Sequence, residues 1–442
     1  MQSTQTMNKG VLEKVFKLSG HNTNVKTEVI AGITTFMTMA YILVVNSNIL
    51  ADAGMDKGAV FAATAIAAFI GSCAMGFLAN YPIALAPGMG LNAFFAYTVV
   101  LGMGYSWQFA LCAVLIEGII FILLTITNVR EKIIDCIPTA LKHAVTAGIG
   151  LFIAFIGLSN AGIVVNGSTI LALGNLKDPL VLLTIFGLLL TAILIARNVK
   201  GAFLVSMLTI SIVGMVGRLV PPPEGVVSAA PSLKPVFMQA FSVPMEQIFS
   251  FDMIVVVFTF LFVDLFDTVG CLVGVASKGD MLDENGKLPK AKQALFADAI
   301  ATTVGALLGT STVTAYVESA AGIGEGGRTG LTAVTTGILF LLALFFAPVF
   351  TAIPTQATAP VLILVGVMMA SSLTKIDFSD FTNAIPAFLT FAMMPLAYSI
   401  ADGIIFGIIS FVVLKIATKR TNEINLSLII LSILFICKFI FL

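Results

Sequence analysis

Charge is scarce in this sequence. Only 10% of the 442 residues are Asp, Glu, Lys or Arg, whereas an ordinary soluble domain has about 25%, so a soluble protein is excluded. The 23 basic residues balance the 23 acidic ones, which leaves no net charge to attract nucleic acid. The five cysteines form no C-x-x-C pair and there are only two histidines, so we expect neither a disulfide framework nor a metal or other cofactor.

Apolar residues make up 58% of the chain and fall into long runs separated by short polar breaks. A helix needs about 20 apolar residues to cross the hydrocarbon core of a bilayer. We therefore predict an all-α membrane protein with fourteen transmembrane segments. The first seven are 27–50, 57–78, 82–100, 108–127, 140–158, 179–196 and 201–220, and the second seven are 251–275, 293–308, 312–324, 329–350, 357–373, 381–398 and 401–417.

Three further segments lie outside these runs. Residues 1–26 are polar, with a short amphipathic pattern between Val11 and Leu18 that predicts a helix at the membrane surface. Residues 221–250 are rich in Pro and Ser and are predicted to form an extracytoplasmic loop. Residues 418–442 form an apolar tail, and the sequence does not decide whether 426–442 crosses the membrane.

The placement of Lys and Arg supports this topology, because basic residues accumulate in cytoplasmic loops. With a cytoplasmic N-terminus, 18 of the 23 basic residues fall on the inner side. The predicted outer side has only Lys57, Lys177, Arg218 and Lys234, and Lys438 lies in the tail. We therefore expect a multi-pass protein of the cell membrane whose N-terminus is cytoplasmic.

The division into seven plus seven has a structural consequence. Because seven is odd, the second set starts from the opposite side of the membrane and is inverted relative to the first. Inverted repeats are a common plan of secondary transporters, whose substrate sites lie near the bilayer midplane. The topology thus indicates a transporter and not an enzyme.

The third crossing of each half is interrupted. In 82–100, Pro82 and Pro87 precede the run GMGLN at 88–92, and the segment 312–324 is short and ends among glycines. Proline removes a backbone donor, and glycine loosens a helix. Non-helical backbone at membrane depth persists only where protein or a polar cavity satisfies its hydrogen-bonding groups. The two breaks therefore predict a substrate site at the centre of the membrane.

Five acidic residues fall inside predicted crossings with no basic residue at comparable depth: Glu117, Asp264, Asp267, Asp298 and Glu318. A charge at the helix centre costs roughly 2.5–3.5 kcal/mol on insertion scales, so these groups must face a polar interior, be protonated, or both. Buried carboxylates can exchange protons near neutral pH, as a proton-coupled carrier requires. Glu117 and Asp298 are expected mainly to hydrogen-bond between helices.

The positions of these groups relative to the breaks select candidate site residues. We predict Asp267, Glu318 and the amide Asn92 as substrate contacts, since Glu318 lies in the second break and Asn92 in the first. Asp264 lies three residues before Asp267 and shares its helix face. It is expected to orient the site or to handle protons.

Several motifs resemble those of the azaguanine-type adenine/guanine/hypoxanthine permeases, which belong to the nucleobase/ascorbate transporter superfamily. These motifs are TFMTMAYIL at 35–43, GMGLNAFF at 88–95, GIGLFIAF at 148–155, FVDLFDT at 262–268 and GTSTVTAYVES at 309–319. The resemblance extends from about residue 27 to residue 417.

The resemblance implies a fold with two domains. The core domain would comprise 27–127 and 251–350, and the gate domain 140–220 and 357–417. In that family, short β-strands from the third and tenth segments meet at the substrate. The resemblance also implies proton symport and a homodimer formed through the gate domains.

Site residues carry over by motif position or by their place beside a motif residue. Those expected to contact or closely approach the substrate are Asp267, Glu318, Asn92, Gly90, Tyr316 and Ser319. Asp264 is expected on the same ground to support the site or to serve proton coupling. Asp298 lies outside these motifs and is expected, as a membrane-depth acid, to serve the same roles.

The chemistry of a neutral purine suits these groups, because carboxylates accept hydrogen bonds from its N–H groups and aromatic rings stack on its face. No cluster of Lys or Arg lies near the predicted site, as a nucleotide phosphate would need. The expected function is proton-coupled uptake of hypoxanthine, guanine or adenine by alternating access, with no order among them. A carrier of the same fold for uracil or xanthine is an alternative, and an intramembrane hydrolase is a remote one.

Overall fold

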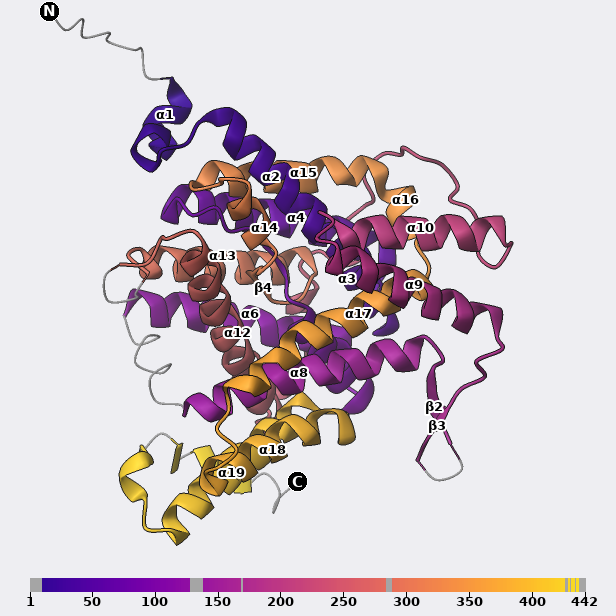
Figure 1. Ribbon diagram of the computed structural model, residues 1–442. Coiled ribbons are helices and arrows are strands. Elements are labelled where there is room, and N and C mark those ends of the chain that lie inside the picture. Colours follow the sequence, from indigo (N-terminus) through magenta and orange to yellow (C-terminus); the bar gives the residue numbers. More distant parts are fainter. Residues whose placement is uncertain are drawn as a thin grey trace, which may run out of the picture.

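Helices make up most of the structure, a computed structural model that describes residues 10–127, 138–167, 170–283, 288–425, 428–429, 431–433 and 435–436 (Figure 1). Of the predicted tail 418–442, most of 426–442 lies outside the described residues, and so do residues 1–9 of the predicted N-terminal segment.

Nine helices in the described part of the chain are long and apolar enough to cross a membrane. They are α2 with α3 (Val25–Met39 and Ile42–Asp52), α4 with η2 (Lys57–Ala74 and Met75–Ala79), α6 (Trp107–Ile126), α8 (Thr139–Asn160), α9 (Pro179–Ala196), α12 (Phe251–Lys278), α15 with η5 and α16 (Gly330–Ala343, Leu344–Phe346 and Ala347–Thr351), α17 with η6 (Thr355–Ala370 and Ser371–Lys375) and α19 (Ile400–Ala417). Each overlaps a predicted crossing, which confirms a multi-pass helical membrane protein.

The other five predicted crossings fall below that length or apolarity. They are α5 with η3 (Met89–Ala93 and Phe94–Gly102), α10 (Ala202–Val216), α13 (Ala291–Leu308), α14 (Ser319–Gly324) with the strand before it, and α18 (Phe381–Leu396). The number fourteen therefore stays a prediction.

Polar caps set where several of these helices begin. The side chain of Asp56 accepts a hydrogen bond from the Ala59 N–H at the start of α4, and Ser250 accepts one from the Met253 N–H at the start of α12. Such caps satisfy N–H groups that have no partner within the first helical turn. The short polar breaks between apolar runs thus supply helix starts.

Helices from the two halves of the chain pack on one another in two groups. In one group α13 packs on α4 and α6, and α15 packs on α2 and α4. In the other, α8 packs on α17 and α18, and α9 packs on α17. Figure 1 shows α8 and α17 side by side across the middle of the molecule. These groups contain the helices predicted as core and gate respectively, and the domain division itself stays a prediction.

The α8–α17 contact is close because small residues meet there. A Cβ added at Gly150 would lie 2.8 Å from the Gly366 carbonyl oxygen, and one added at Gly366 would clash with the Gly150 oxygen. Further along, Gly157 lies against Ala359. Residue numbers therefore rise along α8 as they fall along α17, and the two helices are antiparallel.

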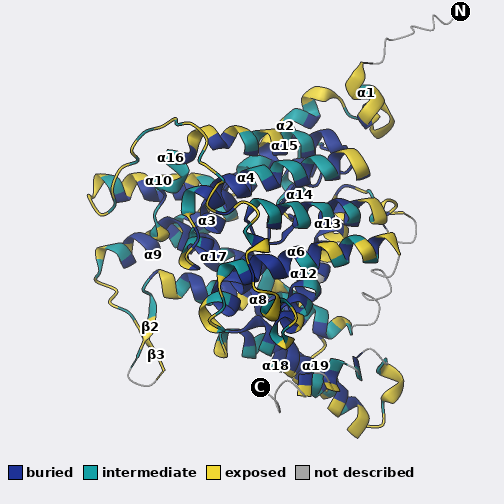
Figure 2. Cartoon of the chain, turned by 180° about the vertical axis from the view of Figure 1, so that it is seen from behind, coloured by how far each residue is buried: buried dark blue, intermediate teal, exposed yellow. Residues whose placement is uncertain are grey.

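The outward face of α9 is apolar and exposed. Leu182, Phe186, Leu189 and Ile193 follow one another at helical spacing and are 47–59% exposed. Buried residues concentrate instead in central helices such as α4 and α17 (Figure 2). An exposed apolar stripe of this kind suits contact with lipid.

Two short strands meet where the third and tenth segments are broken. β1 (Leu85–Pro87) pairs antiparallel with β4 (Val313–Ala315), and the ladder continues where the Gly88 N–H donates to the Thr312 carbonyl at 3.0 Å. Each break thereby satisfies main-chain groups of the other at membrane depth. The predicted breaks and the pairing of their strands are confirmed.

Two features lie outside this bundle. A second antiparallel pair, β2 (Val164–Asn166) with β3 (Leu171–Leu173), follows α8 and has no counterpart in the sequence-based expectations. The amphipathic pattern predicted within 1–26 forms α1 (Val11–Phe16). Phe16 of this helix packs, together with Leu18, on Leu331 of α15.

Candidate functional site

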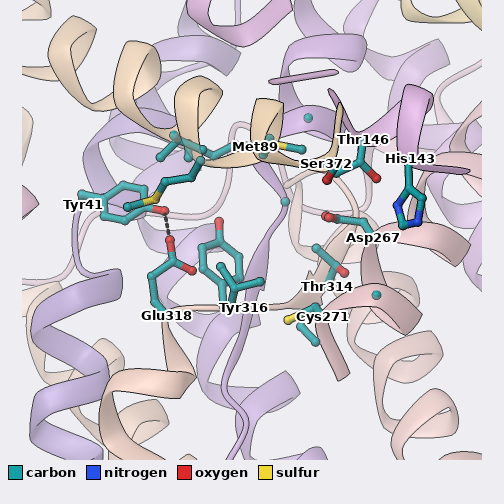
Figure 3. A pocket seen from close by; sticks show the side chains of 18 of the residues that line it. Tyr41, Met89, His143, Thr146, Asp267, Cys271, Thr314, Tyr316, Glu318 and Ser372 are labelled. Carbon is teal, nitrogen blue, oxygen red and sulfur yellow. Dashed lines mark hydrogen bonds between the residues drawn. The ribbon is translucent and has the colours of Figure 1, made fainter. Parts of the chain in front are cut away.

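A cavity of about 310 Å³ lies beside the β1–β4 pair, where both broken segments turn into helices. Residues that follow the two strands and residues of α12 line one side, and residues of α8 and α17 line the other. Figure 3 shows the carboxylates of Asp267 and Glu318 on either side of Tyr316, with Met89 above them in this view. A concave space with a few convergent polar groups is typical of a small-molecule site.

Glu318 lies between β4 and α14 and is held by a tyrosine from the first half of the chain. The fully buried Tyr41, at the junction of α2 and α3, donates its hydroxyl hydrogen to Glu318 Oε1 at 2.6 Å. Tyr316 is fixed in a similar way, since its hydroxyl donates to the Pro87 carbonyl at 2.5 Å and its N–H donates to the Ala84 carbonyl at 3.1 Å. Contacts to the first half thus position both residues at this end.

Asp267 projects from α12 into the cavity near Thr314 of β4 (Figure 3). Two hydroxyl side chains from the opposite wall, Thr146 of α8 and Ser372 after α17, point toward the same part of the cavity. A carboxylate accepts hydrogen bonds, whereas a hydroxyl can both donate and accept. This end of the cavity can therefore bind a ligand that carries both N–H groups and ring nitrogens.

Behind Asp267, one buried hydroxyl connects two carboxylates. Thr268 Oγ1 lies 3.0 Å from Asp264 Oδ1, 3.0 Å from Asp298 Oδ1 and 2.6 Å from Thr314 Oγ1. A hydroxyl carries a single hydrogen, so Thr268 donates to one carboxylate at a time. Asp264 and Asp298 are fully buried and are not among the described lining residues. They therefore lie behind the cavity wall, and Thr268 connects them by hydrogen bonds to Thr314, which lines the cavity.

Two of the predicted substrate contacts, Asn92 and Ser319, have side chains that lie outside the cavity lining. The described lining residues do not include Asn92 or Ser319. The Ser311 hydroxyl donates to Asn92 Oδ1, and Ser319 Oγ accepts a hydrogen bond from the Ala84 N–H at 3.0 Å. Both side chains join the third segment to the tenth, and their direct contact with a substrate stays a prediction.

Gly90 lines the cavity and also marks a close approach of two helices. A Cβ at this position would lie 2.5 Å from Cγ2 of Ile149 on α8. Gly88, before α5, is similarly constrained, since its Cβ would lie 2.6 Å from Cγ2 of Thr314. The glycines predicted to break the third segment therefore also allow α5 to approach α8 and β4.

Glu117, on α6, has the helix-to-helix contact expected of it. The Thr312 hydroxyl donates to Glu117 Oε2 at 2.7 Å, and both residues are fully buried. This bond ties α6 to the tenth segment just before β4.

Several lining residues are not expected from the sequence reasoning, among them Tyr41, Met89, His143, Thr146 and Ser372. Tyr41 is a polar residue inside an apolar motif, and His143 is one of only two histidines, so each gave a usable signal. Thr146 and Ser372 gave none, because single hydroxyls are common in membrane helices.

Basic groups occur only toward the mouth of the cavity among its described lining residues. These are His143, near the start of α8, and the exposed Lys375 at the end of η6. Nowhere in the described ranges do three His, Cys, Asp or Glu side chains form a group that could hold a metal ion. The deep part, with its two carboxylates, suits a neutral ligand with N–H donors better than an anion.

Comparisons with known proteins agree with this geometry. The Permease family model for xanthine and uracil permeases matches residues 26–434. Over 441 residues the chain is 47% identical to the adenine permease AdeP of Escherichia coli, covering 99% of this chain and 98% of AdeP. Also over 441 residues, it is 48% identical to the guanine/hypoxanthine permease PbuG of Bacillus subtilis, covering 98% of this chain and 100% of PbuG.

A solved structure shares the fold. The transmembrane domain of BicA, a cyanobacterial bicarbonate transporter, matches with a TM-score of 0.64 at 13% identity, covering 87% of this chain and 97% of that domain. At this identity the likeness concerns the fold alone, whereas the family match and the two relatives span nearly the whole chain. The protein therefore belongs to the xanthine/uracil Permease family of the nucleobase/ascorbate transporters, and it is a multi-pass transporter of the cell membrane and not an enzyme.

Proposed function

We propose that this protein carries purine nucleobases, namely adenine, guanine or hypoxanthine, into the cell together with protons. The observation that carries the proposal is the pair of carboxylates, Asp267 and Glu318, on either side of Tyr316 in one cavity built from both broken segments. The two relatives compared above are named as permeases for adenine and for guanine and hypoxanthine.

In the proposed complex the purine lies between the two carboxylates. Asp267 and Glu318 accept hydrogen bonds from its N–H groups, and the hydroxyls of Thr146 and Ser372 serve its ring nitrogens or exocyclic group. Tyr316 stacks on the flat face of the ring system. A free base is electrically neutral, which is why no cation is needed beside the acids.

Proton coupling is proposed to use the acidic pair behind the cavity. Asp264 and Asp298 compete for the single hydrogen of Thr268, so a proton bound by either one changes which of them Thr268 donates to. Thr314 shares a hydrogen bond with Thr268 and lines the cavity, so it transmits the change to the substrate wall.

The transport cycle is proposed to be alternating access. His143 and the exposed Lys375 line the cavity on the side that the distribution of basic residues assigns to the cytoplasm, so we take the cavity to open inward. The helices predicted as the core then move past α8 and α17, which belong to the predicted gate. A homodimer through the gate domains, as the resemblance implies, belongs to the same proposal.

Uptake of radiolabelled hypoxanthine, guanine and adenine by cells that lack their own purine permeases tests the substrate assignment. We expect Asp267→Asn and Glu318→Gln each to lower initial uptake by between about tenfold and 150-fold, because a hydrogen bond to a charged group contributes roughly 1.5–3 kcal/mol. The matched control Asp377→Asn, on an exposed loop, should keep normal uptake. Normal uptake by either site variant at equal membrane level contradicts the site.

Two additions to this assay separate the remaining alternatives. A protonophore should abolish accumulation of purine against its gradient, and accumulation that persists overturns proton coupling while leaving the substrate intact. Unlabelled uracil and xanthine are added as competitors. If they block uptake at lower concentrations than the purines do, the alternative substrate is correct.

A further inference from the structure

A second cavity, of about 210 Å³, lies at the far end of the helices that line the site. Four stretches of helix each contribute to both cavities. A residue of the first cavity and one of the second are, in turn, Tyr41 and Asn48 at the start of and within α3, Gly90 and Tyr97 in α5 and η3, Thr146 and Asn160 in α8, and Val365 and Thr355 in the antiparallel α17. At 1.5 Å per residue, Thr146 and Asn160 are about 21 Å apart along α8. The second cavity therefore opens toward the opposite side of the membrane.

The two cavities are separated where α5 packs on α8. Ile149 of α8 lies so close to Gly90 that no side chain fits between them. Beyond this contact, the buried side chains of Tyr97 and Leu362 line the inner part of the second cavity. Exposed residues such as Asp52 and Thr355 line its outer part. Its shape is that of a funnel closed at the inner end.

A hydrogen-bonded bridge crosses this funnel. The hydroxyl of Tyr97, on η3, donates to Asp52 Oδ2 at 2.7 Å and accepts a hydrogen bond from Asn160 Nδ2 at 3.2 Å. The Tyr97 ring also packs edge-on against Tyr398, which contacts Phe152 of α8 in the same way. Tyr97 thus joins η3 and α3 to α8 across the funnel.

The funnel also contains an unused donor. Asn48 lines it, and the buried Nδ2 of this residue has no hydrogen-bond partner among the described residues. Apolar side chains of Val45, Ile49 and Leu362 form the adjacent wall. An amide donor, a carboxylate acceptor and a flat apolar wall are the groups that a free purine binds.

We infer that the second cavity is an outer nucleobase site, where a free purine binds from outside before it reaches the central cavity. This inference rests on the proposed function. The purine hydrogen-bonds to Asn48, Asp52 and Asn160, and it competes with Tyr97 for the last two. Binding therefore loosens the bridge between η3 and α8, which are the elements that must separate before the path to the central site opens.

A cysteine reporter at the rim tests this site. Thr355→Cys is placed in a chain whose five native cysteines are replaced by serine and which retains uptake. Its labelling by a membrane-impermeant maleimide is followed in right-side-out vesicles. We expect hypoxanthine, guanine or adenine to slow labelling saturably and at least threefold. Labelling of this cysteine only in inside-out vesicles overturns the outer placement.

Purine binding at the central site could also slow labelling, through a change of conformation. Disabling the central site distinguishes this effect from binding in the second cavity. With Asp267→Asn in the same chain, the slowing should persist, and its disappearance overturns the outer site. Asn48→Ala and Asn160→Ala should each raise the half-protecting purine concentration about tenfold, whereas the matched control Asn175→Ala, on an exposed loop of the same side, should not. Unchanged protection in both cavity variants likewise overturns it.

Failure of the proposed function is distinguishable from failure of the outer site. The thermal stability of the purified protein is measured with the same purines, since a ligand that binds only the folded form raises it. Stabilisation without slowed labelling overturns the outer site alone. If neither response occurs, the purine assignment fails as well.

Discussion

The hydroxyl of Tyr41 and the carboxylate of Glu318 are separated by 277 positions in the chain, yet they form one of the shortest contacts at the site. Tyr41 is fully buried and its ring packs edge-on against Phe203 on α10 at 5.1 Å. The tyrosine is therefore fixed by the helices around it, and its hydroxyl holds the carboxylate in one orientation. Glu318 is thus positioned before any ligand arrives.

Replacing Tyr41 by phenylalanine removes this hydroxyl and keeps the ring. We expect Tyr41→Phe to raise the half-saturating purine concentration for uptake by between about tenfold and 150-fold, because a hydrogen bond to a charged group is worth roughly 1.5–3 kcal/mol. The measurement is the concentration dependence of initial uptake at equal membrane level. Tyr105→Phe, which removes a hydroxyl from a loop outside the site, is the matched control and should leave that concentration unchanged. An equal effect of both substitutions contradicts the positioning role.

The site shows which residues a sequence can predict. Asp267 and Glu318 stand out because acids are costly in a membrane, and the structure brings both to one cavity. The side chain of Asn92 accepts a hydrogen bond from Ser311 of the opposite segment, a contact that the sequence alone does not indicate. Thr146 and Ser372 reach the cavity only because α8 and α17 pack together, and that contact depends on distances between helices far apart in sequence.

At the scale of elements, the contact of α5 with α8 joins the predicted core to the predicted gate. Both breaks were predictable from Pro, Gly and segment length, and so was their conversion into strands through the family resemblance. The role of Gly90 in this contact was not predictable, because the loosening of a helix is already a sufficient reason for a glycine in a break. Only the position of Ile149 shows that space is needed there.

A methyl group at position 90 tests whether this contact must slide during transport. We expect Gly90→Ala to lower the rate of purine uptake at least tenfold, because its Cβ would lie 2.5 Å from Cγ2 of Ile149. Adding Ile149→Ala to the same chain should restore part of the rate, since it removes the atom in conflict. Uptake by both single variants and the double variant is compared at equal membrane level. A double variant no better than Gly90→Ala would show that the clash is not the cause.

At the scale of the whole molecule, fixed charge pairs gather at the ends of helices. Arg420, after α19, contacts Asp380 at the start of α18 at 2.8 Å and Glu423 at 2.6 Å. Hydrogen bonds lower the pKa of Asp380 from its ordinary value to about 2. The bond from the Thr382 hydroxyl has the largest effect, and the bond from Arg420 comes second. A group whose pKa is lowered in the folded state stabilises that state above the unfolded pKa and ceases to do so as the pH falls through the folded pKa.

The melting temperature of the purified protein between pH 6 and pH 2 reports this contribution. It should be fully present above about pH 4 and lost toward pH 2. We expect Asp380→Asn, which can still cap α18, to lower the melting temperature at pH 6 and to make it fall less steeply over that window. The matched control is Asp178→Asn, which caps α9 in the same way. If both substitutions change the slope equally, the ion pair is not its source.

The pairing of β1 with β4 also orders the events of biosynthesis. The first half of the chain enters the bilayer with the backbone of Leu85–Pro87 lacking its partner strand, and it stays so until Val313–Ala315 has been inserted. Unpaired peptide groups are expensive in hydrocarbon, so the nascent protein is least stable during that interval. Neither half made alone can complete the strand pair, and a ribosome that stalls before residue 313 leaves a fragment suited to degradation.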